Sequence, residues 1–511
     1  MSLAFKAFYI EEPDLVFGYK REEKDPRIGL KYHGPYFFES DAGPTPSRVN
    51  VGIIGDATTL TQTKVILEAL TNPIPSLSTN KWLYPDFPGF NLSTSIRCEF
   101  KTNHLWEVAL TEAEIKRVID ISDAGQRITA GVNLFRDAVD KIHDENPNVI
   151  ICALPDLIEQ RCGISPWTRG AKTPKFTELE ELAAAMAKED QSLLDEWGFS
   201  PNDEAKEPVR PQTDLDFHNA LKGKTMKFDI PVQLLRYSTI RGFSDYGKTK
   251  RDVQEPATIA WNIGTALYYK ANGKPWRLAK LRESDCYVGI SFFKNKRNPD
   301  PDIQTSMAQV FTHSGEGIVL RGSEVVKDKA RGEAHMSEKQ AFGLMKDALE
   351  KYEGKQHHAP GRVVIHKTSS FSQDEMKGFN EAIGEKTLRD YVTIYRRNDY
   401  RFLRTGSYPV LRGTMIMVAH DKCLLYTSGY IPRVRTYPGS RIPEPLAIIR
   451  IGDSELTQIC SEIMGLTKLN WNTTAFATSM PITVAFSASV GKVLGELDDD
   501  KDIKDHYRFY M

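Results

Sequence analysis

The sequence is poor in the residues that build disulfide-rich or zinc-binding proteins. No two of its cysteines form a C-x-x-C pair, and none has a histidine partner at zinc-finger spacing, so neither a disulfide framework nor a structural zinc site is expected. A reducing cytoplasm is the simplest compartment for such a chain. The 511 residues contain six cysteines: Cys98, Cys152, Cys162, Cys286, Cys423 and Cys460.

Long apolar runs are also missing. No uninterrupted apolar stretch approaches the ~20 residues of a membrane span. The first residues carry Glu11, Glu12 and Asp14, which is not the pattern of a secretory signal peptide. Apolar residues still make up 40% of the chain, so we expect packed interiors, and a length of 511 residues predicts two or three domains.

The chain has almost no net charge, because 67 Lys or Arg oppose 68 Asp or Glu. The balance is nevertheless uneven. The stretch from Phe217 to Asp300 holds 16 Lys or Arg against 7 Asp or Glu, a local excess of 9. A solvated surface and a site for an anionic ligand explain this excess equally well.

The first half of the chain alternates strands and helices. Val49 to Ile54 is a strand pattern, and a helix pattern follows from Thr61 to Leu70. A second helix is expected from Gly131 to His143, followed by the buried strand Val149 to Pro155. This order predicts a doubly wound, Rossmann-like α/β domain.

Three other regions differ from this first domain. Residues 1 to 48 have little regular pattern and read as an arm laid over a later domain. Lys172 to Asp214 is rich in acidic residues and proline, which indicates an insertion. From Cys286 onward, strands are interleaved with helices at 338 to 352, 373 to 383 and 455 to 464, which predicts a second α/β domain with a mixed sheet.

Four polar side chains of the basic stretch have a spacing that suits one phosphate. His218 and Lys222 share one face of a helix, because they are four residues apart. Gln233 lies in an extended segment, and Lys270 lies in the last turn of an apolar helix that stops at Asn272. Lysines supply charge, histidine donates or stacks, and the amide fixes orientation. Exposed polar faces and a helix C-terminal dipole are the ordinary alternatives for each residue taken singly.

The order of these residues resembles the 5′-phosphate pocket in the MID domain of Argonaute proteins. The shared pattern is H-x-x-x-K, a glutamine eleven residues after that lysine, and a later K-x-x-G at a helix end. The stretches IPVQLLRYSTI, YYKANGKPW and VIICALPD, with LTKLNWN and YRFYM near the end, are similar to those of short prokaryotic Argonautes. The resemblance covers nearly the whole chain.

This resemblance implies a fold and a ligand. Residues 49 to 270 would form a Rossmann-like MID domain, and residues 271 to 511 an RNase H-like PIWI domain, after an arm at 1 to 48. The MID domain would anchor the 5′-phosphate of a guide, expected to be RNA. Complementary single-stranded DNA would then pair with the guide in a basic channel between the two domains.

The resemblance also implies a metal ion. Eukaryotic relatives carry a further lysine at the position of Ala266, one turn before Lys270. Prokaryotic members hold a divalent cation there with the help of the terminal carboxylate. Mg²⁺ bound with the carboxylate of Met511 is therefore implied for this chain, and oxygen ligands suit that cation.

The second domain lacks the carboxylates of an RNase H-like nuclease, which needs several of them to hold two metal ions. Active relatives have aspartate where this chain has Ser291 and Thr368. Residues 454 to 497 contain neither Asp nor His, and Glu324 would replace one ligand at most. We expect no target cleavage, and a nuclease with non-standard ligands is the alternative.

Partners follow from the same resemblance. Short Argonautes lack the N-terminal and PAZ domains and pair with a separate protein that carries an APAZ region fused to an effector. That effector is an NAD-hydrolysing TIR or sirtuin-like domain, or a nuclease. The implied function is prokaryotic defence against plasmids or phages, in which target capture switches on the partner.

One competing motif lies in the basic stretch. Gly242 to Thr249 matches the P-loop pattern G-x-x-x-x-G-K-[ST], which would make the chain an ATPase. The residues after it are a poor helix start, because Pro256 follows closely. A chance match is the preferred interpretation.

Overall fold

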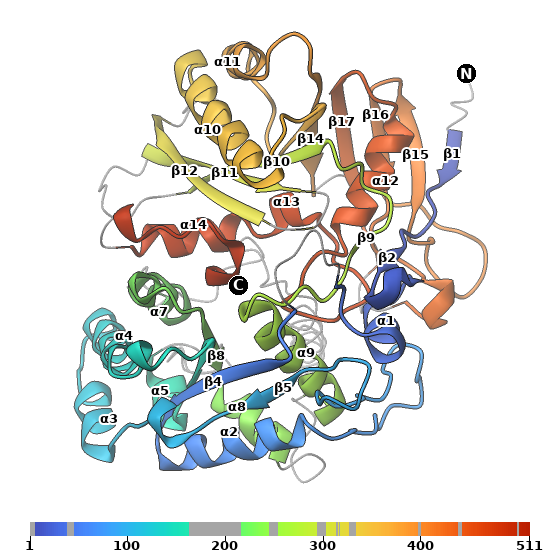
Figure 1. Ribbon diagram of the computed structural model, residues 1–511. Coiled ribbons are helices and arrows are strands. Elements are labelled where there is room, and N and C mark those ends of the chain that lie inside the picture. The colour runs from blue at the N-terminus through green and yellow to red at the C-terminus, as the bar shows by residue number, and fades with distance from the viewer. Residues whose placement is uncertain are drawn as a thin grey trace, which may run out of the picture.

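A computed structural model gives the fold of the chain (Figure 1). It describes residues 6–37, 45–162, 216–244, 254–293, 303–312, 315, 317–326, 334–396, 400–437, 442–497 and 500–511. The expected insertion, Lys172 to Asp214, lies outside these residues. Among the described helices, none is both long and apolar enough to cross a membrane.

The smaller main sheet is parallel and has the strand order β5-β4-β7-β8, with β6 also paired to β4. Its strands are β4 (Arg48–Gly55), β5 (Glu99–Lys101), β6 (Glu107–Ala109), β7 (Val149–Ala153) and β8 (Val232–Leu235). Helices pack on both faces, as expected for a doubly wound sheet. On one face lie α2 (Ala57–Ala69), α8 (Tyr237–Ser244) and α9 (Pro256–Lys270). On the other lie α3 (Glu112–Ile119), α4 (Ala124–Asp140), α5 (Asp156–Arg161) and α7 (Phe217–Thr225).

The larger sheet is mixed and has the strand order β1-β15-β16-β17-β14-β13-β10-β11-β12. The central strands β10, β13 and β14 run parallel, and the outer pairs are antiparallel. Its strands are β1 (Lys6–Tyr9), β10 (Asp285–Phe293), β11 (Ile303–Phe311), β12 (Gly317–Val326), β13 (Arg362–Lys367), β14 (Leu388–Tyr395), β15 (Thr414–Ala419), β16 (Lys422–Leu425) and β17 (Leu446–Gly452).

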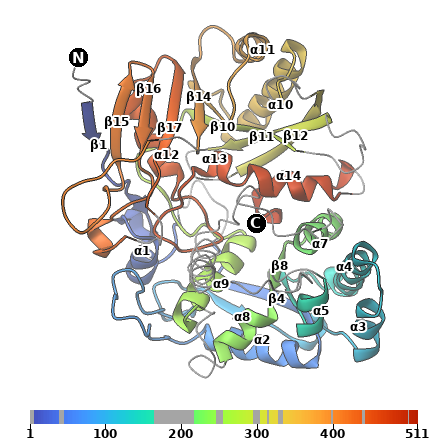
Figure 2. The same cartoon turned by 180° about the vertical axis from the view of Figure 1, so that it is seen from behind.

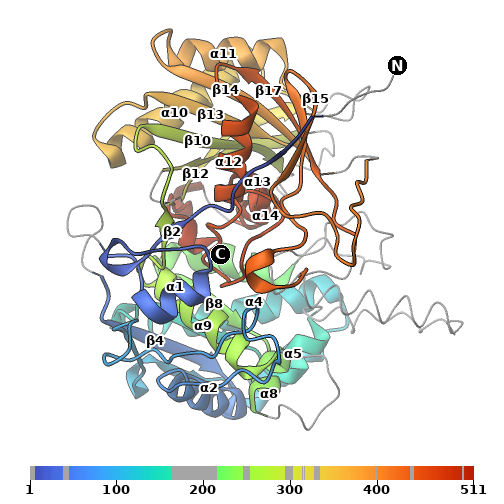
Figure 3. The ribbon, with the colours of Figure 1, turned by 90° about the vertical axis from the view of Figure 1, so that its right-hand side faces the viewer.

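Helices cover this sheet as well (Figures 1 and 3). The helices α10 (Glu338–Gln356) and α11 (Gln373–Ile383) pack on one face, and both begin with a capping box, at Ser337 with Gln340 and at Ser372 with Glu375. The opposite face carries α12 (Leu456–Leu466), α13 (Ile482–Ala485) and α14 (Ser487–Gly495). The prediction of two successive α/β units, the second with a mixed sheet, is confirmed.

The N-terminal residues pair with two later segments of the chain. β1 pairs with β15 of the larger sheet. β2 (Leu15–Val16) pairs with β3 (Glu22–Glu23) and with β9 (Arg277–Leu278), and α1 (Pro26–His33) follows. The division at 48 and 270 stays a prediction.

One apolar core runs through both sheets. Val51 of β4, Tyr268 of α9, Ile463 of α12 and Tyr507 near the end of the chain belong to the same buried cluster. Views from the front, the back and the side all put the C-terminus at the centre of the molecule, between the two sheets (Figures 1, 2 and 3). The last residues therefore lie where elements of both sheets meet.

Candidate functional site

The four residues expected to bind phosphate come from three elements of the smaller sheet. His218 and Lys222 lie on α7, which begins at Asp216, whose side chain accepts a hydrogen bond of 3.0 Å from the Asn219 N–H. Gln233 lies on β8, beside the buried strand β7.

Lys270 is the last residue of α9. That helix starts at Pro256 and is followed by Asn272 with a φ of 69°, the expected left-handed stop. The last residues of the chain, Tyr510 and Met511, lie beside these three elements.

Direct contacts join three of these residues to the end of the chain. The Lys270 Nζ donates to the Gln233 Oε1 at 2.8 Å and to the main-chain oxygen of Met511 at 2.6 Å. The Lys222 Nζ donates to the main-chain oxygen of Tyr510 at 3.1 Å. The structure thus gathers the lysines and the glutamine around the chain end.

Both ammonium groups are buried, since Lys222 is 5% exposed and Lys270 is 1% exposed. Burial lowers the pKa of Lys222 to about 7, and the carboxylate of Asp216 opposes that shift. Burial and the charge of Lys222 hold the pKa of Lys270 well below its ordinary value. The lowered pKa values show that the protein groups around the two lysines do not offset the cost of burying their charges, so the cluster favours an anion.

His218 belongs to the same electrostatic cluster. Burial first, and then the charges of Lys222, Lys270 and Arg236, hold its pKa well below the ordinary histidine value. A neutral imidazole is therefore the resting form, and it can still donate one N–H. Arg236, directly after β8, is a cation of this site that the spacing argument missed.

The oxygen atoms that accept from Lys270 could also be ligands of Mg²⁺. The Gln233 Oε1 and the Met511 main-chain oxygen converge on one point, where the Lys270 Nζ lies, and such oxygens are hard ligands. Ala266, one turn earlier on α9, is buried and adds no charge. In the described part of the chain, no group of three His, Cys, Asp or Glu side chains forms a ready-made metal site. A cation here would therefore need oxygens of the ligand to complete its coordination.

The depressed lysine pKa predicts that anion binding takes up a proton. Between pH 7 and the ordinary lysine range, Lys222 is largely neutral in the free protein, whereas a bound phosphate raises its pKa and protonates it. Affinity for a 5′-phosphorylated oligonucleotide should fall by about tenfold per pH unit for one linked proton as the pH rises from 7 to 9. Titrations by fluorescence anisotropy measure this slope, and a 5′-hydroxyl oligonucleotide is the control. An equally flat profile for both would contradict the proton uptake.

A second set of expected site residues lies in the larger sheet. Ile290 of β10 pairs in parallel with Lys367 of β13, so the next residues, Ser291 and Thr368, lie side by side at the carboxyl ends of these strands. The Ser291 Oγ is buried and has no hydrogen-bond partner among the described residues, and Thr368 is exposed. Glu324 is exposed on the edge strand β12, two strands from β10. Both residues carry hydroxyl groups, at the two positions where the resemblance leads us to expect the aspartates of active relatives.

A buried ion pair joins Lys367, the last residue of β13, to Glu375 of α11. The Lys367 Nζ donates to Glu375 Oε1 and Oε2 at 2.8 and 2.9 Å, and both side chains are at most 1% exposed. The Glu375 carboxylate also accepts the N–H groups of Met336 and Ser372. These contacts and Lys367 hold the pKa of Glu375 below its usual value against the effect of burial. This carboxylate is therefore fully engaged with protein groups.

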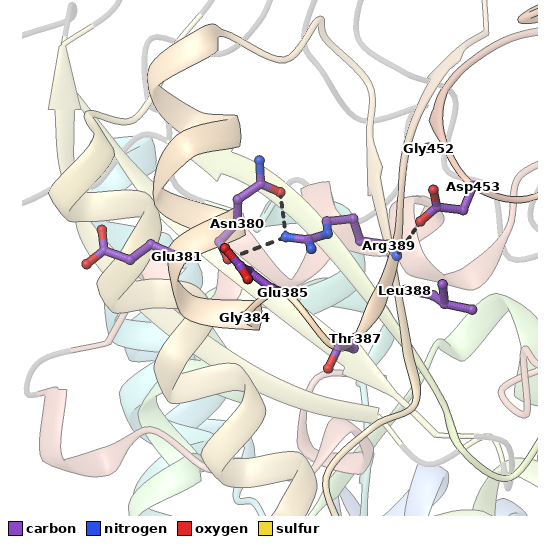
Figure 4. A pocket seen from close by; sticks show the side chains of 9 residues that line it. All are labelled: Asn380, Glu381, Gly384, Glu385, Thr387, Leu388, Arg389, Gly452 and Asp453. Carbon is purple, nitrogen blue, oxygen red and sulfur yellow. Dashed lines mark hydrogen bonds between the residues drawn. The ribbon is translucent and has the colours of Figure 1, made fainter.

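A surface hollow of about 780 Å³ lies at the other end of the larger sheet (Figure 4). The Arg389 guanidinium crosses it to the Asn380 Oδ1 at 3.0 Å, and the Arg389 N–H donates to Asp453 at 3.4 Å. Ligands of α/β sheets bind at the carboxyl ends of parallel strands, whereas Leu388 begins β14 on this side. The hollow is therefore not the preferred site.

The P-loop motif is only partly within the described residues. Gly242 and Ser244 form the end of the helix α8. A phosphate loop requires an open backbone between its glycines, so this helix argues against an ATPase. Residues 245 to 249 lie outside the described part.

The fold is similar to that of solved Argonaute structures. The Clostridium butyricum Argonaute bound to a guide DNA (5′ deoxycytidine) and a 19-mer target DNA matches 97% of this chain and 53% of its own, with a TM-score of 0.62 and 15% identity. The crystal structure of Aa-Ago with externally bound siRNA matches 99% and 56%, with a TM-score of 0.58 and 14% identity. For the Aquifex aeolicus Argonaute the shares are 98% and 57%, with a TM-score of 0.56 and 15% identity.

No protein-family model and no curated protein sequence matches the chain. The chain spans about half the length of the solved structures that it matches. The structural likeness confirms the expected fold, a Rossmann-like MID unit followed by an RNase H-like PIWI unit.

Proposed function

We propose that the chain is a short prokaryotic Argonaute that anchors a guide by its 5′-phosphate and captures complementary single-stranded DNA without cutting it. The observation that carries this proposal is that two buried lysines, one of them bonded to a glutamine, donate to the last two residues of the chain. The likeness in fold to Argonautes that hold guide and target DNA or siRNA supports it. Sequence is then read by base pairing, while the protein contacts the backbone.

In this proposal Lys222 and Lys270 supply the charge for the phosphate, and Gln233 and His218 orient it. Both lysines already donate to protein oxygens, so the protein holds their ammonium groups in place before a phosphate binds to them. That arrangement lowers the ordering cost of binding. Charge-assisted hydrogen bonds of this kind are worth about 1.5 to 3 kcal/mol each.

Mg²⁺ belongs to the same proposal. The carboxylate of Met511 would hold it together with phosphate oxygens, and the ion would neutralise charge where Ala266 supplies none. A chelator should then weaken retention of 5′-phosphorylated RNA. Unchanged retention would exclude the ion from the site.

Nucleic acid that copurifies with the protein tests the guide proposal directly. After extraction, end labelling with and without phosphatase treatment should reveal short RNAs that carry a 5′-phosphate. Nuclease treatment with RNase or DNase distinguishes RNA guides from DNA guides. Absence of any short 5′-phosphorylated species would count heavily against the proposal.

We expect no cleavage of the captured target. Ser291 and Thr368 provide no carboxylate, and Glu375 is committed to Lys367, so two metal ions cannot be clamped beside a scissile phosphate. The protein, loaded with guide RNA, should leave labelled complementary DNA intact in Mg²⁺ or Mn²⁺. A guide-dependent product of fixed length would establish the nuclease alternative instead.

The biological part of the proposal concerns a partner. A non-cleaving guide complex acts through another protein, here an APAZ-domain effector with a TIR or sirtuin-like NADase or a nuclease, in cytoplasmic defence against plasmids or phages. Copurification of the protein encoded by the adjacent reading frame would identify this partner. An adjacent protein without an APAZ region or effector domain would contradict this part.

A further inference from the structure

The last residues of the chain bind to both sheets. On the larger sheet, the Val319 N–H of β12 donates to the Asp505 oxygen at 2.8 Å, and Ile318 forms an antiparallel bridge with His506. Toward the smaller sheet, the Lys504 ammonium lies 3.1 Å from a carboxylate oxygen of Asp229, just before β8. The chain end thus connects the edge strand β12 to the phosphate site.

Tyr507 is the anchor of this chain end. It is 2% exposed, and its ring lies edge-on to Phe311 of β11 and to Phe486, with ring centroids 5.8 and 5.3 Å apart. Gly317 of β12 leaves room for it, since a Cβ at that glycine would lie 3.1 Å from the Tyr507 Cβ. Burying an aromatic ring against other rings contributes several times as much to the free energy of folding as a side-chain contact on the surface does.

The anchor is coupled to the pocket over a very short distance along the chain. Tyr507–Phe509 forms one turn of 3₁₀ helix, and the Tyr510 N–H donates to the Tyr507 oxygen at 3.0 Å. The main-chain oxygens of Tyr510 and Met511 then accept hydrogen bonds from the ammonium groups of Lys222 and Lys270, respectively. Any movement of the Tyr507 ring therefore moves the acceptors that hold both lysines.

We propose that Tyr507 is a positioning residue for the terminal phosphate: its seat on the larger sheet fixes the main-chain oxygens that aim the two pocket lysines. This inference rests on the proposed guide-binding function. Both sheets then contribute to the pocket. The lysines belong to elements of the smaller sheet, and the larger sheet fixes the position of the oxygens that accept from them. The ligand is a phosphate monoester at the end of an oligonucleotide.

The test compares affinities for one RNA with a 5′-phosphate and with a 5′-hydroxyl. In Tyr507→Ala, the dissociation constant for the 5′-hydroxyl RNA divided by that for the 5′-phosphate RNA should fall by about tenfold. That factor is about what one neutral hydrogen bond contributes, and the loss reflects the poorer alignment of both lysines. Affinity for the 5′-hydroxyl RNA should not change. Tyr507→Phe should keep the ratio, because the Tyr507 hydroxyl is buried without a partner in the described structure.

Phe379→Ala is the matched structural control, because Phe379 is a fully buried ring on the opposite face of the larger sheet. It should lower the thermal midpoint and leave the ratio unchanged. Tyr507→Leu serves the same test where the alanine variant does not fold. A normal ratio in Tyr507→Ala or Tyr507→Leu overturns the inference alone. A wild-type protein that does not distinguish the two RNAs overturns the proposed function with it.

Discussion

Replacing Lys222 and Lys270 together by methionine should abolish the preference for a 5′-phosphate. Each lysine offers a charge-assisted hydrogen bond worth about 1.5 to 3 kcal/mol, so the double variant should lose roughly 10² to 10⁴-fold in affinity for 5′-phosphorylated RNA. Fluorescence anisotropy titrations measure that loss. The thermal midpoint should not fall, because both ammonium groups are buried at a cost that depresses their pKa values.

Lys227→Met is the matched control for this pair. Lys227 lies in the 3₁₀ turn Met226–Phe228 after α7 and is exposed, so its loss removes one general contact to nucleic acid and affects both RNAs equally. The phosphate preference should survive in this control. If it also survives in the double variant, the assignment of the pocket is wrong.

Glu375→Gln should strongly destabilise the larger sheet. The substitution leaves the Lys367 ammonium buried beside a neutral amide, and breaking a buried ion pair in this way costs about 3 to 5 kcal/mol. The thermal midpoint should fall by roughly 6 to 10 °C. Differential scanning calorimetry is the preferred measurement, since a chain with two sheets need not unfold in one step.

The double variant Lys367→Met/Glu375→Gln separates charge from packing. It removes both charges and keeps an acceptor for the Met336 and Ser372 N–H groups. The thermal midpoint should therefore regain most of the decrease caused by Glu375→Gln. A double variant that is less stable than Glu375→Gln would contradict the ion-pair account. Affinity for the 5′-phosphate should not change in either variant, because these residues lie in the other sheet.

Periodicity identified the elements that carry the phosphate site. The strand before Gly55, the apolar helix from Pro256 and its stop at Asn272 all have strong local signals, namely a buried run, a proline at the first turn and a residue that tolerates positive φ. Helix spacing likewise put His218 and Lys222 on one face. The helix α4 begins at Ala124, earlier than expected at Gly131, because Asp123 caps it.

Long-range features had no local signal. β11, α13 and α14 were not predicted, and α14 packs against α7 only in the folded chain, where Gly223 approaches Glu496 and Val493. The resemblance to Argonautes implied a role for Met511, but not the contact between Lys222 and Tyr510. Nor does spacing along the chain reveal that Lys367 pairs with Glu375, because a lysine after a strand is usually solvated.

The central claim is that this chain recognises a terminal phosphate. The most direct test measures the dissociation constants of the wild-type protein for one RNA sequence carrying either a 5′-phosphate or a 5′-hydroxyl, in the same buffer at pH 7 with Mg²⁺. We predict that the phosphate strengthens binding by about 100-fold or more, the equivalent of at least 2.7 kcal/mol from two charge-assisted contacts. Equal affinities for the two RNAs would contradict the account.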